Sequence, residues 1–115
     1  MKRFLSAVLF SAALLAKSEI SWAPTHSNLA EGMCFFSSAQ IDGVAIDALV
    51  DGKIIHRDGK PQHRSDYAND VYFFKMPIGS LDTFRVRRLN IEAAGKVYEV
   101  EPATSGVVTV EGDRR

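Results

Sequence analysis

Two histidines and two aspartates are the residues of this sequence best suited to binding a metal ion. His56 precedes a charged stretch, residues 57–70, that contains His63, Asp66 and Asp70. Imidazole and carboxylate groups bind divalent metals, so one hypothesis is a metal site formed by His56, His63, Asp66 and Asp70. Their spacing matches neither a histidine pair one helical turn apart nor a zinc ribbon. The alternative interpretation is a long, solvated polar loop.

A cluster of arginines could bind an anionic partner. Arg85, Arg87 and Arg88 are close in sequence, and Lys75 would join them if its strand paired with theirs. Successive side chains of a regular strand alternate between its faces, so Arg85 and Arg87 would share one face. Guanidinium groups bind glycan, lipid or protein anions through charge-assisted hydrogen bonds. The alternative is a solvent-exposed face whose charges protect an edge strand.

Nucleophilic catalysis has little support in the sequence. Cys34 is the only cysteine, so an intramolecular disulfide is impossible, although an intermolecular one is a possible use of an odd thiol. Its apolar setting, Met-Cys-Phe-Phe, favours a buried, unreactive core residue. The chain contains neither a glycine-rich phosphate loop nor a Gly-x-Ser-x-Gly motif. We therefore predict a protein that is not an enzyme and that uses no cofactor.

The first 23 residues resemble a secretory signal peptide. Lys2 and Arg3 form a positive start, and residues 4–16 carry no charge. That run is shorter than the roughly 20 residues a membrane-spanning helix needs, and it is typical of the hydrophobic region of a signal peptide. We expect an exported protein, periplasmic or extracellular, with no stable membrane span after processing. An uncleaved anchor or a buried hydrophobic helix is the alternative.

Two positions fit signal-peptide cleavage. Ser21 and Ala23 place small residues at the −3 and −1 positions, with Pro24 after the cut, whereas a cut after Ala16 places Leu14 at −3. Taking the first position, we predict four segments. These are a helical signal peptide at 1–23, a flexible lead-in at 24–32, a β-domain at 33–110 and a frayed tail at 111–115.

The β-domain is predicted from runs of β-branched and aromatic residues between turn signals. The clearest element is a hairpin in which Asp51-Gly52 joins two such runs, since this dipeptide suits a type I′ turn. Phe84 and Val86 differ in parity from Leu89 and Ile91, which predicts a β-bulge near Arg87-Arg88. The predicted strands, about seven in number, cover residues 33–36, 44–50, 53–56, 71–76, 83–93, 96–101 and 107–110.

This pattern predicts an all-β fold, namely a small antiparallel β-sandwich, with a small barrel as the second choice. The formal charge is balanced, with 14 basic and 14 acidic residues, and the product of the expected cleavage would be slightly acidic. Such a charge does not favour nucleic acid as a partner.

Residues 44–110 resemble PEGA-like domains, which are small bacterial envelope β-sandwiches. The resemblance lies in the Val-Asp-Gly-Lys turn at 50–53, an aromatic strand that ends at Pro77-Ile78-Gly79, and the glycine-containing hairpin that follows. It implies a non-catalytic envelope module and identifies no functional residues.

Together these features predict a non-enzymatic exported module for binding or envelope structure. Its partner would be a protein or a surface polymer, bound through the 57–70 loop or through the face of Arg85 and Arg87. The oligomeric state is left open. The alternative function is a periplasmic metal-binding protein that uses the histidines of the loop.

Overall fold

The structure is a computed structural model that describes residues 17–27, 30–65 and 70–111. Within these ranges the chain forms nine β-strands and no helix. The strands are β1 (Lys17–His26), β2 (Glu31–Ser37), β3 (Ile41–Val50), β4 (Lys53–Gly59), β5 (Gln62–His63), β6 (Val71–Lys75), β7 (Arg85–Ala93), β8 (Lys96–Val100) and β9 (Gly106–Glu111).

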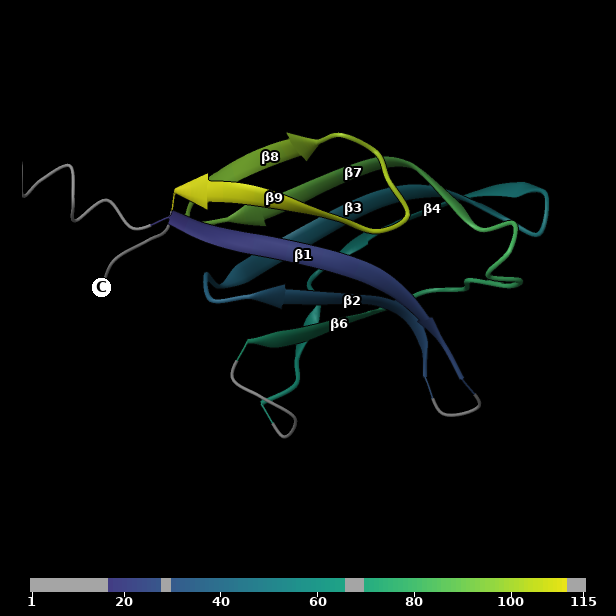
Figure 1. Cartoon of the computed structure of the whole chain (residues 1–115), viewed down its shortest axis with the longest axis horizontal. Helices are drawn as coiled ribbons and strands as arrows, with labels where there is room; N and C mark the ends of the chain where they lie inside the picture. The colour runs from purple at the N-terminus through teal and green to yellow at the C-terminus, as the bar shows by residue number, and fades with distance from the viewer. Residues whose placement is uncertain (1–16, 28–29, 66–69, 112–115) are drawn as a thin grey trace, which may run out of the picture.

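The strands form two antiparallel sheets that pack face to face (Figure 1). The five-stranded sheet has the order β5-β6-β2-β1-β9, and the four-stranded sheet has the order β4-β3-β7-β8. Every pairing between neighbouring strands is antiparallel. The predicted all-β, sandwich-like fold is therefore confirmed, whereas the predicted signal-peptide helix falls largely on residues 1–16, outside the described residues. The described part contains no helix that is long and apolar enough to cross a membrane.

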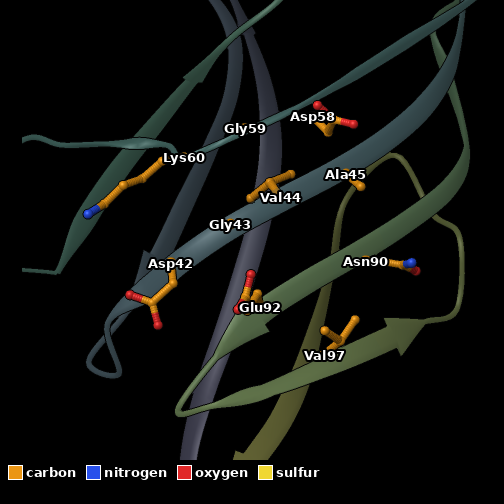
Figure 2. A pocket seen from close by; sticks show the side chains of 10 residues that line it. All are labelled: Asp42, Gly43, Val44, Ala45, Asp58, Gly59, Lys60, Asn90, Glu92 and Val97. Atoms are coloured by element: carbon orange, nitrogen blue, oxygen red, sulfur yellow. The ribbon is translucent and has the colours of Figure 1, made fainter.

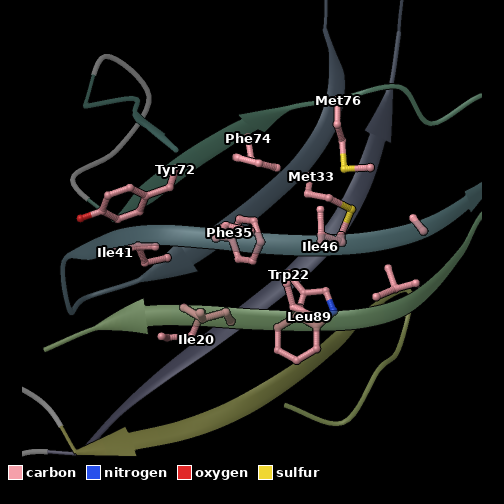
Figure 3. Packing of buried hydrophobic residues seen from close by; sticks show 14 of the residues in the cluster. Ile20, Trp22, Met33, Phe35, Ile41, Ile46, Tyr72, Phe74, Met76 and Leu89 are labelled. Atoms are coloured by element: carbon pink, nitrogen blue, oxygen red, sulfur yellow. The ribbon is translucent and has the colours of Figure 1, made fainter. Parts of the chain in front are cut away.

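Alternating side chains from both sheets form the core (Figure 3). Along β2, Met33 and Phe35 are fully buried, and along β3 the inward positions include Ile46. The burial of each such side chain contributes roughly 1.5–3 kcal/mol to folding. The segment between β6 and β7 closes one end of the core with three more buried side chains, Met76, Ile78 and Phe84.

Two hairpins are built on two-residue turns with positive φ angles. Asp51 and Gly52, between β3 and β4, have φ values of 48° and 85°, as expected for the predicted type I′ turn. Ala94 and Gly95 join β7 to β8 in the same way, with φ values of 54° and 77°. These turns set the register within the two hairpins that make up the four-stranded sheet, β3-β4 and β7-β8.

Two strands lie where none was predicted. β1 covers residues 17–26, and β2 begins at Glu31, so the segment 24–32 contains parts of both strands rather than a lead-in alone. The core residues of β1, Ile20 and Trp22, lie on either side of Ser21. They follow the hydrophobic run 4–16 so closely that the predicted leader includes them. The other strand, β5, lies in the predicted 57–70 loop, and β4 extends three residues into that loop.

Two carboxylates hold the segment after β6. Glu31 Oε2 accepts hydrogen bonds from the backbone N–H groups of Ile78, at 2.7 Å, and Gly79, at 2.9 Å. Asp51 Oδ1 accepts one from the N–H of Ser80, at 3.1 Å. The bonds from Gly79 and Ile78 lower the pKa of Glu31 because they favour its charged form. The hairpin turn and the start of β2 are thus both tied to the loop that closes the core.

We predict that Gly79→Ala destabilises the fold more than Gly95→Ala does. Both glycines have left-handed φ angles, 68° and 77°, so both variants are strained by roughly 1–2 kcal/mol. Only at Gly79 would the added Cβ also collide with a neighbour, the carboxylate of Asp51, whereas the space around Gly95 is open. Urea unfolding of both variants measures the difference, and equal midpoints would contradict this account of the loop.

Candidate functional site

A β-bulge on β7 sets the geometry of the predicted arginine cluster. Asp47 of β3 pairs with Arg88, whereas the next residue, Ala48, pairs with Val86. Arg87 is therefore the extra residue of the bulge, as the parity of the buried side chains predicted. Val86 and Leu89 are both buried, although three positions separate them. Arg87 is exposed on the outer side of the sheet.

The three arginines have different contacts. Arg85 Nη1 donates to two carbonyl oxygens of the preceding loop, those of Asp82 at 3.1 Å and Phe84 at 2.7 Å. Arg88 Nη1 lies 3.5 Å from Asp47 Oδ2. Arg87 makes no hydrogen bond or ion pair with any described residue. The bulge thus exposes one guanidinium whose donors are open to a ligand, beside two that are partly engaged.

Lys75 does not belong to this cluster. It lies on β6, which pairs with β2 and β5 in the five-stranded sheet, whereas the arginines lie on β7 in the other sheet. Strands β6 and β7 follow each other in the chain, but the segment between them crosses from one sheet to the other. The condition under which Lys75 would join the arginines, pairing of its strand with theirs, is therefore not met.

A histidine between two aspartates continues the outer face beside Arg88. His56 on β4 is paired in register with Asp47 on β3, and its Nδ1 is hydrogen-bonded to Asp47 Oδ1. Its other nitrogen, Nε2, lies 3.2 Å from Asp58 Oδ2. The hydrogen bonds to Asp47 and then to Asp58 raise the pKa of His56. Both contacts are satisfied together by the imidazolium form, which donates from both ring nitrogens.

The predicted metal site is not assembled from the described residues. His56 lies on the four-stranded sheet, whereas His63 lies on β5 of the five-stranded sheet, where its ring stacks on Tyr72 with centroids 4.5 Å apart. Asp70 directly precedes β6 in the five-stranded sheet, and Asp66 is outside the described residues. Among the residues that the structure describes, no three His, Cys, Asp or Glu side chains gather in a group that could hold a metal ion.

A shallow groove crosses the same outer face and has a volume of about 420 Å³. At its centre β3 places the small residues Gly43 and Ala45 between larger side chains on β4 and β7 (Figure 2). Three of its lining residues are acidic, and Lys60 is its only basic one. The full lining is Asp42, Gly43, Val44, Ala45, Asp58, Gly59, Lys60, Asn90, Glu92 and Val97.

The outer face therefore has two ends of opposite charge. The arginine end is formed by Arg85, Arg87 and Arg88 at the start of β7, and the acidic groove lies towards the end of that strand. Asp47 and His56 lie between them. A partner that lies along β7 would meet donors at one end and carboxylates at the other.

Comparison with protein-family models, with curated proteins and with solved structures gives no match for this chain. The resemblance of residues 44–110 to PEGA-like domains stays a prediction.

Cys34 is not the core residue that the sequence predicted. Met33 and Phe35 point into the core with no exposed surface, so Cys34 and Phe36 point to the opposite face of β2. Cys34 is partly exposed there, and Phe36 is 45% exposed. Burial still raises the pKa of the Cys34 thiol, which lowers its reactivity. The apolar run 33–36 suggests burial throughout, but alternation along the strand directs every second side chain outward.

We predict that Asp47→Asn lowers the pKa of His56 and that Asp58→Asn lowers it less. The hydrogen bonds of charged His56 stabilise the fold fully at a pH below the unfolded-state pKa of about 6.5. This stabilisation is lost as the pH rises through the folded-state pKa. An NMR titration of the His56 ring measures the pKa, and urea unfolding against pH measures the linked stability. An unchanged titration midpoint in Asp47→Asn would rule out this hydrogen bond as the cause.

Proposed function

We propose that this protein is an exported, non-enzymatic β-sandwich module that binds an anionic group of a protein or surface polymer. The observation that carries the proposal is Arg87, which the bulge on β7 holds outward with its donors unpaired among the described residues. A guanidinium binds carboxylate, sulfate or phosphate groups through two parallel hydrogen bonds. Arg85 and Arg88 beside it add charge that attracts such a group.

Three further points support the proposal. A rigid sheet holds the arginines more firmly than a loop would, because neighbouring strands fix the backbone on both sides of the bulge. Cys34 lies on the five-stranded sheet, whereas His56, the histidine beside the arginines, lies on the four-stranded one. The residue pattern of 1–23 supports export, as does the resemblance of residues 44–110 to envelope domains.

We predict that Arg87→Glu weakens binding to an anionic probe by roughly tenfold, about the value of one lost charge-assisted hydrogen bond. Suitable probes are polyglutamate and a sulfated glycan, each titrated by biolayer interferometry at two salt concentrations. Lys75→Glu is the matched control, because it makes the same charge change at an exposed position of the other sheet. The double variant Arg85→Glu/Arg87→Glu should bind more weakly still.

Equal losses in Arg87→Glu and Lys75→Glu would show that the probes respond only to net charge, and would refute a specific site. Thermal unfolding of each variant checks that the fold is unchanged, as we expect for residues whose side chains are exposed.

A further inference from the structure

Strand β1 is an interior element of the fold, not an appendage. It lies between β2 and β9 in the five-stranded sheet (Figure 1) and pairs with both along most of its length. Ile20 has no exposed surface, and Trp22 is 4% exposed (Figure 3). Residues 17–23 therefore supply two large side chains to the core and the partner strand for β9.

Trp22 makes two contacts with the end of the chain that leads into β9. Its Nε1 donates a hydrogen bond to the carbonyl oxygen of Ala103, at 2.9 Å, which ties β1 to the connection between β8 and β9. The indole also lies directly against Gly106, where an added Cβ would be 2.8 Å from Trp22 Cζ2. A residue with a Cβ would therefore collide with this ring at the start of β9.

Cleavage after Ala23 would remove both core side chains and most of β1. Among the described strands, β9 pairs only with β1, so it would lose its neighbour, and the Ala103 carbonyl would lose its donor. The inner face of the four-stranded sheet would then be exposed to water above the gap. The product that begins at Pro24 therefore lacks the strand that pairs with β9 and two large side chains of the core.

We infer that the leader is removed between Ala16 and Lys17, so that the mature chain begins with β1. The inference rests on the export part of the proposed function. The reaction is peptide hydrolysis by a signal peptidase: water adds to the Ala16 carbonyl, the amide bond to Lys17 breaks, and a carboxylate and a new α-amino group result. Ala16 supplies the small residue that such enzymes require before the cut, and every residue of β1 is retained.

The two candidate bonds lie at different places along β1. Ala23 pairs with Cys34 in the middle of β1 and β2, so a cut after Ala23 would divide the strand between its paired residues. The bond after Ala16 lies just before the first paired residue of β1, so a cut there leaves every pairing of the strand in place.

The test uses the full-length chain with its leader, expressed in a bacterial host with a periplasm. Intact mass and N-terminal sequencing of the extracytoplasmic product should give a chain that begins at Lys17. We predict that Ala16→Phe abolishes this product, because a large residue before the cut is rejected. Ala23→Phe is the matched control and should be processed at the same rate as the unchanged sequence. Pulse labelling follows processing before folding, so a folding defect in either variant does not affect the result.

The outcomes separate the two proposals. An exported product that begins at Pro24 would overturn the inference and leave export standing. An unprocessed chain that stays in the cytoplasm would overturn export, and the inference with it. Cleavage that persists in Ala16→Phe but disappears in Ala23→Phe would also place the site at the second position and overturn the inference.

Discussion

The alternation of side chains along each strand is the constraint on which the rest of this structure depends. Two sheets share one apolar interior, so every strand must place its apolar residues on the inner face. In β7 this requirement conflicts with the sequence, because Val86 and Leu89 both need burial although they differ in parity. The extra residue of the bulge resolves the conflict. The exposed position of Arg87 is thus a direct consequence of how the core is packed.

The same constraint explains the groove on that face. An outward position on a central strand is lined by the strands on both sides, so a small residue there leaves a hollow. Gly43 and Ala45 are such positions on β3: Ala45 is flanked by Asp58 on one side and Asn90 on the other, and Gly43 pairs with Glu92 (Figure 2). The inward neighbours of the two small residues, Val44 and Ile46, are buried as usual. The outer face can therefore vary in shape and charge without any change in the core.

The sequence was sufficient to predict the features that depend on neighbouring residues. The Asp51-Gly52 turn, the bulge near Arg87 and seven of the strands follow from turn chemistry and alternation over a few positions. Features that depend on tertiary pairing could not be obtained this way. The separation of Lys75 from the arginines is one example, because the sequence does not show which sheet β6 joins. The contacts of Glu31 and Asp51 with the 78–80 backbone are another, since they join residues far apart in the chain.

β1 shows how one interpretation can conceal another. Residues 17–23 read as the end of a leader because they follow an apolar run, yet Ile20 and Trp22 also fit a strand with one buried face. The local pattern alone does not distinguish the end of a leader from a half-buried strand, because small and apolar residues are typical of both. The structure places residues 17–23 in a strand, where Trp22 donates a hydrogen bond to the carbonyl oxygen of Ala103 and packs on Gly106. The arginine face depends on that segment indirectly, since the inward side of β7 packs against the sheet that β1 completes.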